Sequence, residues 1–202
     1  MNLGSTQGNR PLRDRLREET CRTILEAAEA VLAEEGLQAR MESIAARAGV
    51  AVGTLYNHFE HRDGLVRALV RARRDALLAR VDAALAATSS RGAADQLRAF
   101  LSAIAEHGRA HGPLLSTLAQ AGEGPGSPRP PAALFAELSA RVDTVLARGI
   151  AAGELRLDPS GVFGQALVGM ARAVLFRALD ASGDPRPAVD AVLDLFLRGA
   201  RA

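Results

Sequence analysis

MESIAARAGVAVGTLYNHFEHRDGL, residues 41–65, is the stretch of this sequence that decides the fold. Its first apolar residues share one face of a short helix, which we predict to end at Gly49. A second short helix is predicted over about 51–59, where Leu55 and Phe59 lie four residues apart and form the core-facing pair. Two short helices joined by a glycine-containing turn form a helix-turn-helix pattern, whose second helix fits the major groove of DNA. On spacing alone, a small polar helix with a half-buried Tyr explains the same stretch.

The composition of the 202 residues favours an all-α fold. Apolar residues make up 48% of the chain and aromatic residues 3%, and Ala and Leu dominate. Ala and Leu are leading helix formers, whereas strands prefer β-branched and aromatic residues. An all-β fold is therefore excluded. The formal net charge is only +2, so bulk charge does not indicate a nucleic-acid partner and local pattern must decide.

Helical periodicity continues along the rest of the sequence. A long helix is predicted to begin with Asp63 as its N-cap and to end near 88–92. Gly112 and Pro113 are predicted to break the helix that follows, and the Pro- and Gly-rich segment 122–131 is predicted to be a loop. Counted in this way, the chain contains about nine helices and no strand.

The sequence offers little for metal, disulfide or membrane chemistry. The single Cys, Cys21, cannot form an internal disulfide, and four His with one Cys do not supply the usual structural zinc ligands. We therefore predict neither a metal nor a cofactor. The longest charge-free apolar stretch, about 161–171, is shorter than the ~20 residues that cross a membrane, and the N-terminus has no apolar signal core. A cytoplasmic protein without a membrane partner is expected.

The residues of the helix-turn-helix stretch resemble the DNA-binding signature of the TetR family of bacterial transcription regulators. The similarity extends over residues 20 to about 70, and Gly153 to Arg156 resemble a turn that family members often carry before their penultimate helix. The matching positions in the helix-turn-helix stretch are Ile44, Ala45, Ala48, Gly49, Val50, Gly53, Thr54, Leu55, Tyr56, His58, Phe59 and Leu65. The resemblance implies a repressor that is released from its operator by a small molecule.

The resemblance also implies which residues contact double-stranded operator DNA. These are Arg40, Ser43, Val52, Gly53, Thr54, Tyr56, Asn57, His58 and Arg62. The sequence departs from the family pattern at Ala51 and Arg40, where a hydroxyl residue usually caps each helix, and at Glu42, where some relatives place a basic residue. No operator sequence is therefore predicted.

The resemblance implies that the C-terminal helices enclose a pocket for an unknown small-molecule effector and form a homodimer. The candidate pocket residues are mostly apolar, namely Phe100, Ile104, His107, His111, Leu115, Phe135 and Met170. The candidate dimer interface consists of Leu167, Val174, Val189, Val192, Leu193 and Phe196. The implied organisation is a flexible basic arm, a DNA-binding domain and a ligand-binding and dimerisation domain, over residues 1–18, 19–65 and 66–202.

Two other function classes stay open at this point. In one, the protein binds DNA or a partner without any ligand, and the C-terminal bundle only forms the dimer. In the other, it is a helical enzyme that uses His107, His111 and Glu106. The two His lie i, i+4 on one helix, a spacing that can hold a metal, but no set of acid, base and nucleophile is visible. We therefore expect a protein that is not an enzyme.

Overall fold

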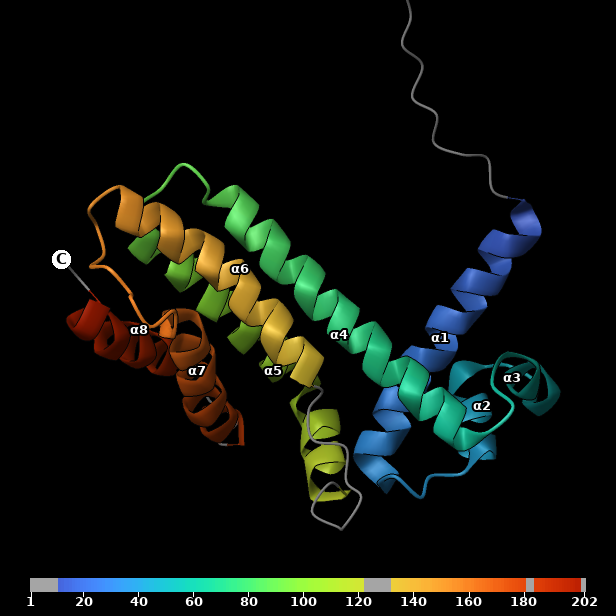
Figure 1. Ribbon diagram of the computed structural model, residues 1–202. Helices are drawn as coiled ribbons and strands as arrows, with labels where there is room; N and C mark the ends of the chain where they lie inside the picture. Colours follow the sequence, from blue (N-terminus) through green and yellow to red (C-terminus); the bar gives the residue numbers. More distant parts are fainter. Residues whose placement is uncertain (1–10, 122–131, 181–183, 201–202) are drawn as a thin grey trace, which may run out of the picture. The chain divides into compact units, whose positions relative to one another are not determined.

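The computed structural model describes residues 11–121, 132–180 and 184–200, and every regular element in these ranges is an α-helix (Figure 1). The helices are α1 (Leu12–Glu35), α2 (Met41–Ala48), α3 (Val52–His58), α4 (Arg62–Ala87), α5 (Ala93–Ala121), α6 (Ala132–Ala151), α7 (Phe163–Asp180) and α8 (Arg186–Ala200). The prediction of an all-α fold is confirmed. The chain divides into two compact units, Met1–Val70 and Arg71–Ala202, and α4 is continuous across their boundary.

The predicted break in the middle of α5 is wrong, which is why about nine helices were expected and eight are described. The helix runs through Gly112 and Pro113 to Ala121. A proline inside a helix costs about 3 kcal/mol because its missing N–H and its ring disturb one turn. Leu114, directly after Pro113, is only 1% exposed, and burial of this side chain offsets the local cost. The predicted loop 122–131 lies outside the described residues.

Helix α1 begins earlier than expected. The flexible basic arm was predicted to extend to residue 18, but α1 begins at Leu12, directly after Pro11. The reason is local, because residues 12–18 are rich in Leu, Arg and Glu, which are strong helix formers, and proline is favoured at a helix start. Residues 1–10 lie outside the described part of the chain.

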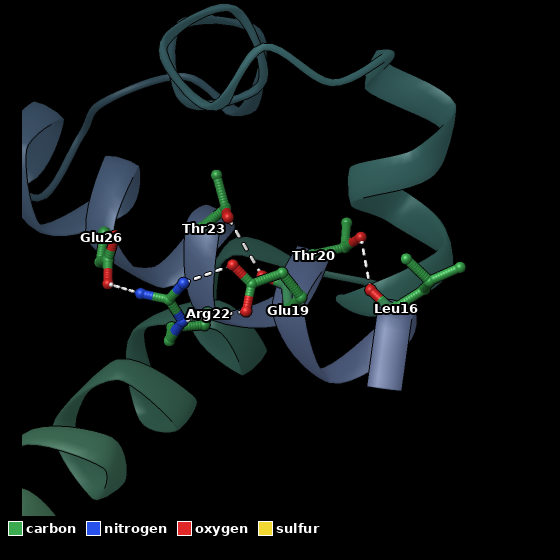
Figure 2. Close-up of polar contacts among 6 residues, drawn as sticks. All are labelled: Leu16, Glu19, Thr20, Arg22, Thr23 and Glu26. Atoms are coloured by element: carbon green, nitrogen blue, oxygen red, sulfur yellow. Dashed lines mark hydrogen bonds and ion pairs between the residues drawn. The ribbon is translucent and has the colours of Figure 1, made fainter. Parts of the chain in front are cut away.

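Side-chain contacts within α1 support its exposed first turns (Figure 2). The Arg22 guanidinium pairs with Glu19 and, at 2.9 Å, with Glu26, which are its neighbours one turn before and one turn after. Such i, i+3 and i, i+4 pairs each add a few tenths of a kcal/mol to a solvent-exposed helix. They help α1 to continue beyond its first buried residue, Ile24, towards the N-terminus.

The N-terminal unit has its own small core. Helix α1 packs against α2, and α2 packs against α3. Leu65 and Leu69 from the first turns of α4 are also completely buried. The other buried apolar residues of this unit are Ile24, Ala27, Ala28, Val31, Leu32, Ala39, Met41, Ile44, Ala45 and Leu55. Helix α1 ends directly before Gly36, which has a φ of 79°.

In the C-terminal unit, α5 packs against α6, α7 and α8, and α7 also packs against α6 and α8. The buried cluster includes Phe100 of α5, Val142 of α6, Leu167 of α7 and Leu193 of α8. Among the described helices, none combines the length and apolar character needed to cross a membrane.

The turn from Gly153 to Arg156 ties the ends of several helices together. Gly153 adopts a φ of 73°, and the Glu154 carboxylate accepts a hydrogen bond of 2.6 Å from the backbone N–H of Ala93 at the start of α5. The backbone N–H of Arg156 donates to the carbonyl of Ala200 at the end of α8 (2.9 Å). This turn thus supplies an acceptor for an N–H at the start of α5, which has no partner within its own helix.

Ion pairs join α4 to its neighbours in the C-terminal unit. Arg141 of α6 donates two hydrogen bonds, of 2.6 and 2.9 Å, to the Asp82 carboxylate. These bonds lower the pKa of Asp82. Arg74 pairs with Glu137 of α6, and Arg80 pairs with Glu106 of α5 at 3.1 Å.

Candidate functional site

The turn between α2 and α3 has the geometry that the sequence predicted. Gly49 follows α2 in the left-handed conformation, with a φ of 67°. Its backbone N–H donates to the carbonyls of Ala45 and Ala46, and the N–H of Val50 donates to the carbonyl of Ala45 at 3.1 Å. Because these bonds close the end of α2, the chain turns sharply and α3 begins three residues later at Val52.

Helix α3 has one buried and one exposed side. Leu55 is completely buried, and Phe59, directly after the helix, is half-buried. Val52 and Tyr56 are 37% and 43% exposed. The predicted contact residues Gly53 and Asn57 are also exposed, whereas Thr54 and His58 are half-buried. The exposed side of α3 therefore offers apolar surface together with amide and phenol groups.

The structure adds one residue to the predicted set. Arg62 is half-buried at the first position of α4, and its guanidinium donates a 2.8 Å hydrogen bond to the side-chain oxygen of Gln38. Gln38 orients Arg62 from the connection between α1 and α2, 24 residues away along the chain. Sequence reasoning missed Gln38, because no local pattern signals a contact over that separation.

Two further predicted residues lie on α2. Arg40 is exposed at the N-cap of α2, and Ser43 is half-buried in its first turn. Neither Arg40 nor Ala51, the N-cap of α3, makes a side-chain capping hydrogen bond. The missing caps agree with the absence of the usual hydroxyl residues at these two positions. The exposed Arg40 guanidinium is available to an external acceptor.

Asp63 does not cap α4 as predicted. The first helical residue is Arg62, two residues earlier than an N-cap at Asp63 would give, and the N–H of Leu65 donates to the backbone carbonyl of His61 at 3.1 Å. Asp63 consequently lies in the first turn, where its negative charge still interacts favourably with the positive end of the helix dipole. This shift places Arg62 on the helix rather than in the preceding loop.

The predicted pocket residues occupy different depths in the C-terminal unit. Phe100 and His107 are buried, and Ile104, His111, Phe135 and Met170 are half-buried. The side chain of Leu115 lies outside the described residues. His107 and His111 contact each other, with 4.5 Å between their ring centroids. Among the described residues, no three His, Cys, Asp or Glu side chains are grouped in a way that could hold a metal ion.

A hollow of about 600 Å³ lies elsewhere, between α5, α8 and the residues that precede α8. It is lined largely by charged and polar groups, and none of the predicted pocket residues contributes to it. The lining residues are Arg98, Ser102, Ala105, Glu106, Arg109, Asp184, Pro185, Arg186, Val189 and Asp190. Its charges are largely paired with each other, since Arg98 pairs with Asp190 and Arg186 with Asp184.

The described residues of the predicted dimer interface are buried within the chain's own core. They are Leu167, Val189, Val192, Leu193 and Phe196, each at most 6% exposed; the Val174 side chain lies outside the described residues. The exposed apolar side chain of α8 is Leu195, at 63%. Gly164 of α7 lies so close to Asp143 of α6 that a Cβ would clash with that carboxylate, so it permits a contact within the chain.

Comparisons with known proteins agree with this arrangement. Residues 24–69 match the family model described as bacterial regulatory proteins, tetR family. These residues include α2 and α3 completely, together with the second half of α1 and the first turns of α4. No curated protein sequence matches the chain.

Solved structures resemble the chain over most of its length. FadR from Bacillus subtilis in complex with stearoyl-CoA is 20% identical, with 88% of this chain and 98% of that chain covered and a TM-score of 0.72. PfmR from Thermus thermophilus, a TetR family regulator, is 24% identical, with coverages of 87% and 97% and a TM-score of 0.68. A putative TetR-family regulator from Rhodococcus sp. is 21% identical, with coverages of 92% and 100% and a TM-score of 0.71. The chain therefore has the fold of the tetR-family transcriptional regulators, and its residues 24–69 form a domain of that family.

Proposed function

We propose that this protein is a sequence-specific DNA-binding regulator that inserts α3 into the major groove of an operator. In this proposal the bound protein represses transcription. The observation that carries the proposal is the exposed side of α3, where Val52 and Tyr56 are open to solvent while Leu55 anchors the helix in the core. A helix of this size held by a short turn is the arrangement by which helix-turn-helix proteins read base edges. Bacterial operator DNA lies in the cytoplasm, where we therefore expect the protein to act.

The nine predicted contact residues divide into two roles. Arg40, Arg62, Tyr56 and His58 are proposed to contact phosphates, which fixes the position of α3 on the duplex. Val52 and Gly53 are proposed to lie nearest the base edges, with Thr54, Asn57 and Ser43 donating to bases or to the adjacent backbone. Gly53 suits this place because a Cβ there meets no other atom, so the α3 backbone is open to close approach.

The protein is further proposed to act as a homodimer through α7 and α8, so that two copies of α3 bind two half-sites of an operator. Half-sites about one helical turn apart match such a two-fold arrangement. Because Leu167 and Phe196 are buried within the chain, the outward residues of the same helices would contact the partner. Leu195 of α8 is the main candidate, together with the small residues Ala166 and Gly169 of α7.

Release by a small molecule is the third part of the proposal. In this proposal the domain expected over residues 19–65 binds DNA, and the domain expected over residues 66–202 binds the effector. Helix α4 is 26 residues long, carries Arg62 in its first turn and continues past Val70 into the C-terminal unit. A ligand that displaces α4 would therefore move a proposed phosphate contact. The similar FadR structure holds stearoyl-CoA, which supports a ligand-binding role for this fold.

Selection of genomic DNA fragments by the purified protein tests this proposal. We expect enrichment of a few fragments that share an inverted repeat, and we expect Tyr56→Ala to lose that enrichment. Leu157→Ala is a suitable control, because Leu157 is 73% exposed and lies in the connection between α6 and α7. If the wild-type protein enriches no sequence above background, the proposed DNA-reading role of α3 is wrong.

A further inference from the structure

The hollow between α5 and the start of α8 has the volume of a small-molecule site. It measures about 600 Å³, and ligand sites in proteins usually span about 300–1,000 Å³. One wall is a single face of α5, on which Arg98, Ser102 and Arg109 follow one another at helical spacing. The other wall is formed by the first turns of α8 and the two residues before it. Ala105 and Val189 also line the hollow and are at most 2% exposed, so it extends from solvent to the core.

The carboxylates that line the hollow all have cationic partners. The three pairs are Asp190 with Arg98, Glu106 with Arg80 and Asp184 with Arg186. Asp184 also accepts a 3.0 Å hydrogen bond from the backbone N–H of Arg186, at the start of α8. Because these pairs neutralise the negative charge of the described lining residues, a cationic ligand would find no unpaired carboxylate there.

Two polar side chains of the α5 wall have no hydrogen bond or ion pair in the described part of the chain. Arg109 is exposed and lies outside the three pairs, so the lining and its ion-pair partners carry one uncompensated positive charge. Ser102 is half-buried, and its hydroxyl can donate to a ligand or accept from one. The two residues are seven positions apart, which is about 10 Å along an α-helix. A ligand that reaches both side chains is therefore a small, elongated molecule.

The lining selects for the charge and the polarity of a ligand. An anionic group is attracted to the Arg109 guanidinium, which presents several N–H donors to a carboxylate or a phosphate. The rest of the ligand must be polar, because an apolar body would take the Arg98–Asp190 pair out of water without supplying hydrogen bonds. Hydroxyl groups suit this body, since they donate to carboxylates and form hydrogen bonds with the Ser102 hydroxyl.

We propose that the hollow between α5 and α8 binds a compact polar anion, a carboxylate or phosphate on a hydroxyl-rich body, as the effector. This inference rests on the proposed function, since it names the chemical class of the effector and its place. The Arg109 guanidinium donates hydrogen bonds to the anionic group, and Ser102 bonds to a hydroxyl of the body. Glu106 lines the hollow and pairs with Arg80 of α4, so the bound ligand lies next to a link to the helix that carries Arg62.

Probes with a common six-carbon chain test the chemistry of the ligand. Gluconate, sorbitol 6-phosphate, sorbitol and glucamine are polyols with a carboxylate, a phosphate, no charge and an ammonium group, and hexanoate has a carboxylate on an apolar chain. Each is added to the full-length protein, and the melting temperature and the calorimetric Kd are measured at pH 7. We expect gluconate or sorbitol 6-phosphate to bind at least about 10-fold more tightly than sorbitol and hexanoate, and the tighter of the two identifies the anionic group. Binding of sorbitol, hexanoate or glucamine as tight as that of both polyol anions, or no binding of either polyol anion below about 10 mM, overturns the proposal.

Matched arginine variants test the location. Arg109→Gln is expected to weaken binding of the preferred anion about 10-fold, and Arg91→Gln to leave it within about twofold. Both arginines are exposed and outside the ion pairs of the described residues, but Arg91 does not line the hollow. Ser102→Ala is a second variant, which should weaken binding about threefold by removing one neutral hydrogen bond. Circular dichroism checks that each variant is folded, and equal losses in Arg109→Gln and Arg91→Gln would contradict the location.

The DNA readout separates this inference from the proposed function. Ligand-free protein is first tested for operator binding, and the preferred anion is then titrated into the complex. Arg109→Gln should bind the operator as the wild-type protein does but need about 10-fold more anion for release. Anion binding that depends on Arg109, in a protein that selects no DNA, refutes the regulator but keeps the anion site. Selective DNA binding by a protein that binds neither polyol anion refutes the anion site alone, and anion binding that leaves operator affinity unchanged refutes its role as the effector site.

Discussion

Gly49 shows how one residue fixes the helix-turn-helix geometry. Its φ of 67° is open to glycine but strains a residue with a side chain, although a Cβ there would meet no atom within 4 Å. We expect Gly49→Val to lower the free energy of unfolding by about 1–2 kcal/mol through backbone strain alone. Urea denaturation followed by circular dichroism measures this change. Gly49→Asn should lose less, because Asn tolerates the left-handed region, and equal losses in the two variants would argue against backbone strain as the cause.

His107 gives the protein a pH-dependent stability. Its folded-state pKa of about 4 lies below its unfolded value of about 6.5, mainly because the side chain is buried, so the unfolded chain binds a proton first as the pH falls. Stability from this group is complete above about pH 6.5 and is lost as the pH falls towards 4. Between pH 7 and pH 5 the loss is about 2 kcal/mol. Urea denaturation at the two pH values measures it.

The comparison of variants isolates this effect from other titrating groups. His107→Gln should remove most of the roughly 2 kcal/mol difference between pH 7 and pH 5. His61→Gln is the control, because the His61 side chain is 79% exposed next to Glu60. A wild-type pH dependence that survives in His107→Gln would show that His107 is not responsible.

At the scale of elements, α3 and the start of α4 form one proposed DNA-contacting surface. Arg62→Ala should weaken binding to all DNA sequences by a similar factor and reduce the slope of log affinity against log salt by about one unit. Fluorescence anisotropy at several salt concentrations provides this slope. Gln38→Ala should weaken binding less, since it removes only the partner that orients Arg62. An unchanged salt slope in Arg62→Ala would exclude a phosphate contact at this position.

Element boundaries followed the sequence where local signals were strong. Helix α2 ends before Gly49 as predicted, because glycine is the residue that adopts the left-handed conformation at low cost. Helix α5 did not follow its local signal, because burial of Leu114, directly after Pro113, offsets the cost of Gly112 and Pro113. Glycine and proline in the middle of a helical pattern are thus weaker evidence for a break than a glycine that adopts the left-handed conformation at the end of a short helix.

For the whole molecule, two adjacent residues of α8 distinguish assembly from folding. Leu195→Arg should convert the proposed dimer to a monomer while the helical content stays unchanged, because Leu195 is 63% exposed. Phe196→Arg should instead unfold the C-terminal unit, because Phe196 is 6% exposed and contacts Phe163 of α7. Light scattering and circular dichroism at micromolar concentration measure both outcomes. A Leu195→Arg protein that is still dimeric would place the interface elsewhere.

The sequence by itself determined the all-α class, the two short helices and the glycine turn between them, because these depend on helix propensity, on residue spacing and on a backbone conformation that favours glycine. The tertiary structure decided which face of each helix is buried. It turned Val189 and Phe196 inwards and left Leu195 exposed, since an apolar stripe has the same pattern whether it packs on its own chain or on a partner. It also brought Gln38 to Arg62 and Arg80 to Glu106, because contacts between residues far apart in the sequence depend on how helices pack.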